Sequence, residues 1–104
     1  MAIINLKLAI DLNPEDINEL YMNLAFEYEN AGKYTDAIDY LKLALVENPE
    51  NHDGLYELAF CYEQSGKLNE SIKFYLEFID SQPYSFSAWY NLGYVYSRLE
   101  LYEK

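Results

Sequence analysis

Two consecutive stretches of this chain decide its fold. Residues 18–51 read NELYMNLAFEYENAGKYTDAIDYLKLALVENPEN, and residues 52–85 read HDGLYELAFCYEQSGKLNESIKFYLEFIDSQPYS. The two stretches align without a gap, so the chain begins to repeat itself at residue 52. A third copy, FSAWYNLGYVYSRLELYEK, opens at residue 86 and runs to residue 104. Periods of about 20 to 50 residues are typical of solenoids, in which each unit buries its apolar face against its neighbours.

The matches extend along the whole period and beyond both full copies. The aligned positions are Leu24, Leu58 and Leu92; Ala25, Ala59 and Gly93; Tyr28, Tyr62 and Tyr96; Gly32 and Gly66; Pro49 and Pro83. The N-terminal residues follow the second half of a copy, because Ala2, Ile3, Leu6, Ala9 and Pro14 correspond to Ala37, Ile38, Leu41, Ala44 and Pro49. We therefore expect a single domain with a partial repeat at 1–17, full repeats at 18–51 and 52–85, and a lone first helix at 86–104.

Each unit has the pattern of two helices. Apolar residues recur every three or four positions over residues 20–28 and again over 37–45, which indicates two amphipathic helices. Between them, Gly32 can adopt the left-handed conformation that ends a helix. All three prolines lie between the predicted helices, where they avoid a cost of about 3 kcal/mol in a helix interior. The sequence therefore predicts an all-α chain of about six helices, arranged in antiparallel pairs.

The overall composition excludes several classes of partner. The formal charge is −11, with 18 acidic residues against 7 basic ones, so nucleic acid and anionic lipid would be repelled. No run of about 18 apolar residues is present, which argues against membrane insertion. The single cysteine, Cys61, cannot form an internal disulfide and favours a reducing, cytoplasmic location. A soluble protein is expected.

The order of these residues resembles the tetratricopeptide repeat. The first copy carries the resemblance at Tyr21, Leu24, Ala25, Tyr28, Gly32, Ala37, Leu41, Ala44 and Pro49. The second carries it at Leu55, Leu58, Ala59, Tyr62, Gly66, Ser71, Tyr75, Phe78 and Pro83, and the third at Trp89, Leu92, Gly93 and Tyr96. The resemblance implies a right-handed α-solenoid. Two departures stand out: Phe78 replaces a small residue, for which we expect Gly93 to compensate, and Glu100 replaces the helix-ending glycine, so the last helix should run on toward Tyr102.

In this family the first helices line a concave groove that holds a peptide. The resemblance places in the groove Glu19, Met22, Asn23, Phe26, Glu29 and Asn30; Asp53, Tyr56, Glu57, Phe60, Glu63 and Gln64; and Ser87, Tyr90, Asn91, Tyr94, Ser97 and Arg98. Members that clamp a C-terminal carboxylate use Lys and Arg where this chain has Met22, Phe26, Asp53, Glu57 and Ser87, so no such clamp is expected. The aromatic and acidic groove favours a protein or peptide with apolar and basic residues. Alternatively, the carboxylates only keep the solenoid soluble and the aromatics pack among themselves.

Catalysis, cofactors and metal ions find no support in the sequence. His52 is the only histidine, lies in a turn and has no cysteine nearby, and Cys61 fits a buried position in mid-helix. Glu27 and Glu29 are two positions apart on a helix, so they do not face each other. We expect a scaffold or adaptor rather than an enzyme. The alternative that the chain is one module of a larger enzyme stays open.

The two ends of the chain are complementary halves of a repeat. Residues 86–104 form a first helix, and residues 2–14 form the second helix that it lacks. We expect each end to expose an apolar face, with the residues Ile3, Leu6 and Ile10 at one end and Leu92, Val95, Leu99 and Tyr102 at the other. A head-to-tail homo-oligomer is therefore the alternative function. Its competing explanation is that the chain is a monomeric piece of a longer protein.

Overall fold

The computed structural model describes residues 17–103, with side chains as far as Glu100. This part contains five helices and no strand: α2 (Ile17–Asn30), α3 (Tyr34–Glu47), α4 (His52–Gln64), α5 (Leu68–Ser81) and α6 (Phe86–Glu103). The predicted all-α fold is confirmed. The helix expected within residues 1–17, which would bring the total to about six, lies outside the described residues.

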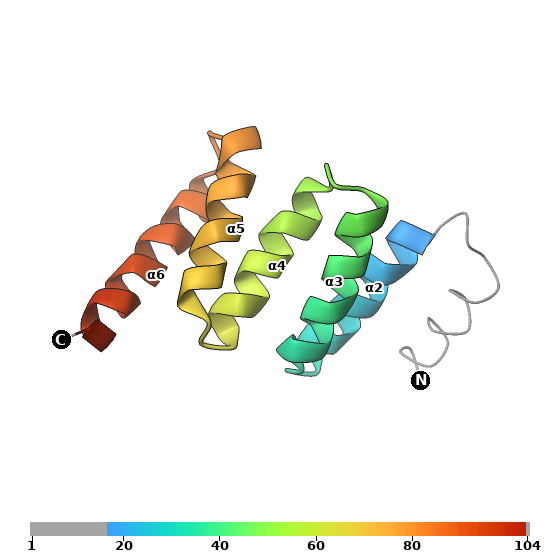
Figure 1. Ribbon diagram of the computed structural model, residues 1–104, viewed down its shortest axis with the longest axis horizontal. Helices are drawn as coiled ribbons and strands as arrows, with labels where there is room; N and C mark the ends of the chain where they lie inside the picture. Colours follow the sequence, from blue (N-terminus) through green and yellow to red (C-terminus); the bar gives the residue numbers. More distant parts are fainter. Residues whose placement is uncertain (1–16, 104) are drawn as a thin grey trace.

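The helices stand side by side in the order of the sequence. Each packs antiparallel against the helix before it, from α2 against α3 through to α5 against α6 (Figure 1). The molecule measures 49 × 26 × 19 Å along its principal axes, so it is elongated along the direction in which the helices stack. This arrangement is an α-solenoid, in which each helix pair contacts only its neighbours.

The turns inside both repeats have the same geometry. At the first, Gly32 has a φ of +75°, the N–H of Lys33 donates to the carbonyl of Tyr28 at 2.8 Å, and Gly32 N–H donates to Glu29 at 2.9 Å. At the second, Gly66 has a φ of +82° and the equivalent bonds measure 2.9 and 3.1 Å. These paired bonds satisfy the last carbonyls of α2 and α4 and need a left-handed residue, which glycine supplies without strain.

The last helix has no such stop. Glu100 stands where the other two units have glycine, and α6 continues to Glu103, giving 18 residues against 13 in α4. The prediction that α6 runs past Glu100 is confirmed. Its start is defined by Ser85, whose Oγ accepts a hydrogen bond of 3.3 Å from the backbone N–H of Ala88.

Small side chains lie fully buried where paired helices approach each other. Ala25 lies in one core cluster with Ala37 of α3, and Ala59 lies in the second cluster with residues of α5. Neither these residues nor Ser71 of α5 has any exposed surface. The aromatic contacts repeat as well: Tyr28 stacks on Tyr40 and Tyr62 stacks on Phe74, both at 5.6 Å between ring centroids. The packing therefore follows the period of the sequence.

Phe78 is accommodated differently from our expectation. Its ring packs edge-on against Tyr56 at 5.2 Å, within the core shared by α4, α5 and α6. Nothing lies within 4 Å of the position that a Cβ of Gly93 would occupy. The prediction that Gly93 makes room for Phe78 is wrong, because Gly93 faces away from that core.

The exposed face of α6 also differs from the expected one. Leu92 and Val95 are buried against α5 in the second core cluster, and Leu99 packs against the same cluster. The apolar residues left uncovered on α6 are instead Phe86, Trp89, Tyr90, Tyr94 and Tyr96. The reason is that Leu92, Val95 and Leu99 pack against the core cluster shared with α5, which leaves the aromatic side of α6 exposed. The other predicted end residues, Ile3, Leu6 and Ile10, and the side chain of Tyr102 lie outside the described part.

Candidate functional site: the first-helix face

The candidate site is the first-helix face, which we define as the exposed and half-buried side chains of α2, α4 and α6 at the predicted groove positions. Asn91 on α6 joins α4 by donating a hydrogen bond of 2.7 Å from Nδ2 to the hydroxyl of Tyr56. Glu29 on α2 interacts with Glu57 on α4. These contacts place side chains from all three first helices next to one another, so the face is continuous along the solenoid.

Most of the predicted groove residues are accessible. The exposed ones are Glu19, Asn23, Phe26, Asp53, Tyr90 and Tyr94, and the half-buried ones are Tyr56, Glu57, Phe60 and Asn91. Two predicted groove residues are buried instead: Glu63 is only 5% exposed, and Met22 is only 8% exposed and packs in the core with Leu58 and Cys61. Their placement corrects the expectation that they line the groove surface. A methionine in the middle of an apolar stripe fills the space between α2 and its neighbours.

Aromatic side chains supply the apolar part of the face. Phe26 is 38% exposed, Tyr94 is 53% exposed and Tyr90 is 66% exposed. Tyr90 stacks on Phe86 at 6.1 Å between ring centroids. Rings held on rigid helices bury large areas at a small entropic cost when a partner covers them.

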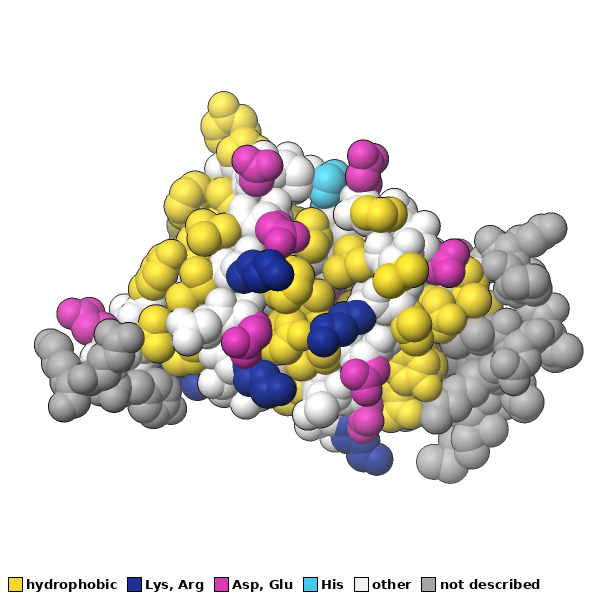
Figure 2. Space-filling view, in the orientation of Figure 1, with side chains coloured by type: hydrophobic (Ala, Val, Ile, Leu, Met, Phe, Trp, Pro, Cys, Tyr) yellow, Lys and Arg dark blue, Asp and Glu magenta, His cyan; other side chains and the backbone are white. Residues whose placement is uncertain are grey.

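The charge of the face is one-sided. Helices α2 and α4 carry six carboxylates, at Glu19, Glu27, Glu29, Asp53, Glu57 and Glu63, and neither helix has a Lys or Arg. The second helices differ, since α3 has Lys42 and α5 has Lys73. Figure 2 shows the resulting mixture of dark blue and magenta side chains on the side of the molecule turned to the viewer. The first-helix face is the more uniformly acidic surface.

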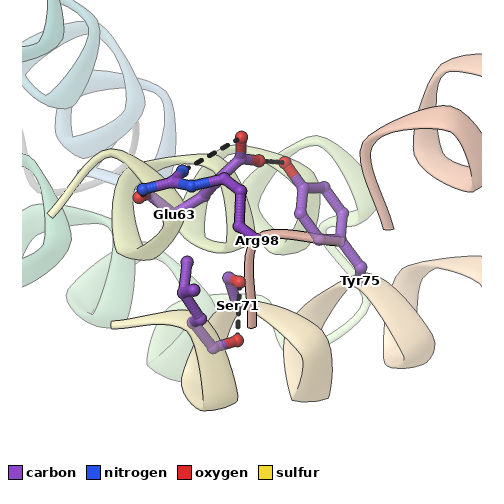
Figure 3. Close-up of polar contacts among 5 residues, drawn as sticks. Glu63, Ser71, Tyr75 and Arg98 are labelled. Carbon is purple, nitrogen blue, oxygen red and sulfur yellow. Dashed lines mark hydrogen bonds and ion pairs between the residues drawn. The ribbon is translucent and has the colours of Figure 1, made fainter. Parts of the chain in front are cut away.

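Glu63 is a buried carboxylate with two partners. The hydroxyl of Tyr75 on α5 donates to its Oε1 at 2.8 Å, and Arg98 Nη1 on α6 lies 3.9 Å from its Oε2 (Figure 3). Arg98 also donates to the backbone carbonyl of Glu63 at 3.5 Å. Burial, followed by the hydrogen bond and charge of Glu63, raises the pKa of Tyr75, which therefore stays a proton donor. The only cation on α6 is thus committed to Glu63.

Glu29 lies in a contrasting environment. Burial, helped by the hydrogen bond and charge of Glu57, raises the pKa of Glu29 to about 8, although a contact with Cys61 acts in the opposite direction. Its Oε2 is buried and has no hydrogen-bond partner in the part of the chain that the structure describes. Sequence reasoning compared Glu29 only with Glu27 on the same helix, and so missed a carboxyl pair that two helices bring together.

Two shallow clefts that the sequence did not predict lie beside the turns that join one repeat to the next, at Pro83 and Pro49. They measure about 470 and 520 Å³, and His52 borders both. His52 Nδ1 lies 3.1 Å from Ser81 Oγ.

Cys61 is buried, and this burial raises the pKa of its thiol. Within residues 17–103, no three His, Cys, Asp or Glu side chains are placed to hold a metal ion. No helix of that region is long and apolar enough to cross a membrane.

Comparison with known sequences identifies the family. A sequence model of the tetratricopeptide repeat matches residues 30–93, and a second model with the same description matches residues 86–104. The chain belongs to the tetratricopeptide repeat family. The first match runs from the last residue of α2 into α6, so it includes the two glycine turns at Gly32 and Gly66. A search of curated proteins found no match to this tetratricopeptide chain.

Solved structures share the tetratricopeptide fold. The first such domain of Spaghetti (RPAP3), bound to the HSP90 peptide SRMEEVD, has 23% identity and a TM-score of 0.85 over 95% of this chain and 80% of that one. The NMR structure of the first domain of human RPAP3 has 24% identity and a TM-score of 0.89, covering 98% and 80%. A crystal structure of MamA has 24% identity and a TM-score of 0.88, covering 95% of this chain and 57% of MamA. These likenesses confirm the α-solenoid.

Proposed function

We propose that this chain is a protein-interaction module that binds a segment of another protein on its first-helix face. The observation that carries the proposal is the combination of exposed Phe26, Tyr90 and Tyr94 with carboxylates and no uncommitted cation on the same three helices. Exposed rings beside ionised groups form a surface that gains binding energy from apolar contact and selectivity from charge.

The charge of this face specifies the partner. The peptide bound by the Spaghetti (RPAP3) domain, SRMEEVD, has three acidic residues and one arginine. Such a peptide would be repelled by Glu19, Asp53 and Glu57, the accessible carboxylates of this face on α2 and α4. A segment with apolar anchors and Lys or Arg side chains fits instead. This chemistry is recognition rather than catalysis, so the module acts as a scaffold or adaptor.

The test uses a phage-displayed library of random 12-residue peptides selected on the immobilised chain. Selected peptides are then measured by calorimetry against the wild type, Phe26→Ala and Tyr94→Ala. We expect each alanine variant to bind about tenfold more weakly, because each removes an exposed aromatic contact. Val46→Ala is the matched control, since Val46 is exposed on α3, away from the first-helix face. Unchanged affinity in both aromatic variants, or no selected peptide at all, would overturn the proposal.

Self-association is a second candidate function, favoured by the uncovered side of α6. Trp89 is 51% exposed and Tyr96 is 48% exposed, and Gly93 lies between them with open space above it. At the equivalent positions Ala25 and Ala59 are fully buried by α3 and α5. The side of α6 that a second helix would cover therefore has no helix upon it among the described residues.

The occupant that we propose for this side is residues 2–14 of a second copy, whose sequence matches a second helix. Sedimentation equilibrium over a concentration series tests the idea, with Gly93→Glu placing bulk and charge on the uncovered side and Leu6→Glu altering the opposite end. Ser87→Glu is the control, because Ser87 is exposed on another side of α6. We expect association that Gly93→Glu and Leu6→Glu abolish and Ser87→Glu preserves. A wild-type monomer at high micromolar concentration would rule it out.

A further inference from the structure

The cleft beside Pro83 adjoins the first-helix face. Its volume is about 470 Å³, and it lies between the start of α4, the end of α5 and the turn of residues 82–85, all at one end of the molecule (Figure 1). Asp53 of the first-helix face forms part of its lining. The Oγ of Ser85, which also lines the cleft, lies 3.4 Å from the Oγ of Ser87, a predicted groove residue on α6. The cleft is therefore continuous with the first-helix face at α4 and at α6.

Hydrogen bonds fix the turn that forms one wall of the cleft. The indole Nε1 of Trp89 donates to the carbonyl of Pro83 at 2.8 Å, and the N–H of Ser85 donates to the carbonyl of Gln82 at 3.2 Å. The backbone N–H of Trp89 donates to the carbonyl of Ser85 at 3.2 Å. The turn is thus attached to α6 by both backbone and side chain. A cleft with such a wall exists before a ligand arrives, so binding requires little ordering of the protein.

One side of the cleft is apolar. Phe78, Pro83 and Tyr84 contribute to the lining. Phe78 is 9% exposed and held in the core, whereas Tyr84 is 96% exposed, so nearly all of its ring is free to contact a ligand. The cleft beside Pro49 differs, because Glu50 stands at the position of Tyr84 one repeat earlier. Of the two clefts, the one beside Pro83 offers aromatic walls to a ring.

The polar side of the cleft offers hydrogen-bond acceptors. The hydroxyl of Ser81 donates to the carbonyl of Phe78 at 3.0 Å, and its Oγ lies 3.1 Å from Nδ1 of His52. Because the single hydroxyl proton is used for Phe78, Nδ1 of the neutral imidazole donates to Ser81, which leaves Nε2 of His52 as an acceptor. Asp53 adds an exposed carboxylate, and the amide of Gln82 can donate or accept. The cleft is complementary to a hydrogen-bond donor at the edge of an apolar ring.

We propose that this cleft binds a tryptophan or tyrosine side chain of the partner segment. The ring packs against Tyr84 and Phe78, and the indole N–H or phenol O–H donates to His52 or Asp53. These two side chains combine a large apolar area with a donor at the edge, and they often supply much of the binding energy at protein interfaces. The inference rests on the proposed function and adds to it an anchor residue and the site that receives it.

The first test needs no selected peptide and uses N-acetyltryptophanamide as the probe. The probe is titrated into isotope-labelled protein, and the backbone amide signals of His52, Asp53 and Ser85 are followed by NMR. We expect a saturable shift with a dissociation constant of about 1 mM, and about tenfold weaker binding of the analogue methylated at the indole nitrogen, which has lost its donor. No saturable shift at these residues, or equal binding of the two probes, would overturn the inference.

Two variants separate the apolar and polar sides of the cleft. Tyr84→Ser should weaken binding of the tryptophan probe about fivefold, with Tyr96→Ser as the control, because Tyr96 is exposed on the uncovered side of α6. The double variant His52→Phe and Asp53→Ala removes both acceptors, and phenylalanine already stands at the equivalent position, Phe86. It should bind the two probes equally. A preference for the unmethylated probe that survives in the double variant would contradict the assigned acceptors.

The final test joins the cleft to the first-helix face. Peptides selected from the random library should carry Trp or Tyr at one fixed register, and replacing that residue by Leu should weaken binding about tenfold. The same peptides should bind Tyr84→Ser more weakly than wild type. Unchanged affinity for Tyr84→Ser and for the double variant would overturn the inference. The proposed function would still stand in that case if Phe26→Ala and Tyr94→Ala weakened binding.

Discussion

The hydroxyl of Tyr75 on α5 donates a buried hydrogen bond of 2.8 Å to the carboxylate of Glu63 on α4. The same carboxylate lies beside Arg98 of α6, so one side chain links three consecutive helices. Because Glu63 is only 5% exposed, its charge depends on these partners rather than on water. The link holds the last helix against the preceding repeat and determines which groups on the first-helix face remain available.

Removing the cation should destabilise the fold. We expect Arg98→Met to lower the free energy of unfolding by about 1 kcal/mol, because Glu63 loses its only nearby opposite charge among the described residues. Urea unfolding followed by circular dichroism measures the change. Adding Glu63→Gln to Arg98→Met should recover part of the loss, since an amide has no charge to leave unpaired. No recovery in the double variant would contradict this account of the pair.

Replacement by alanine should change stability in opposite directions at Gly66, which lies in a turn, and at Gly93, which lies inside α6. Gly66→Ala should cost about 1–2 kcal/mol, because an L residue is strained at a φ of +82° even though no atom lies within 4 Å of the new Cβ. Gly93→Ala should gain about 0.5–1 kcal/mol, since Gly93 lies inside α6 and alanine favours a helix. Thermal unfolding of both variants checks the prediction, and a loss of stability in Gly93→Ala would show that its position is not open.

Enlarging the small residue between paired helices should be costly only where a partner helix is present. Ala59→Leu should lose about 1–3 kcal/mol, because Ala59 is fully buried against α5. Gly93→Leu, at the equivalent position of α6, is the control and should be tolerated. Denaturant midpoints compare the two. Similar losses in both variants would mean that crowding at the helix contact does not explain the effect.

The carboxyl pair predicts a pH-dependent stability difference. The folded chain holds a proton on Glu29 more tightly than the unfolded chain, since the pKa rises from 4.5 to about 8. Stability from this group is therefore fully present below pH 4.5 and is lost as the pH rises through about 8. We expect Glu29→Gln to be increasingly more stable than the wild type from pH 5 to pH 8.5.

Melting temperatures across this pH range provide the measurement. Glu19→Gln is the matched control, because Glu19 is an exposed carboxylate on the same helix and should change stability equally at each pH. A difference between wild type and Glu29→Gln that stays constant from pH 5 to pH 8.5 would refute a raised pKa at Glu29.

Local features of this chain were readable in advance. The gapless repeat, the helix stops at Gly32 and Gly66, and the extension of α6 past Glu100 depend on nearby residues and backbone preferences. Each was predicted, because a glycine that ends a helix and a stripe that repeats every three or four residues act within a few positions of themselves.

The candidate site was only partly predictable for the same physical reason. An apolar stripe marks a buried side of a helix but does not tell which neighbour buries it, so Met22, Leu92 and Val95 were expected at surfaces and lie in the core. The pairing of Glu29 with Glu57 likewise joins two first helices that α3 separates in the sequence. By itself the sequence determined a helical repeat with an acidic first-helix face. Only the tertiary structure decided which carboxyl group has its own cation and which lacks one, because that depends on side chains brought together from different helices.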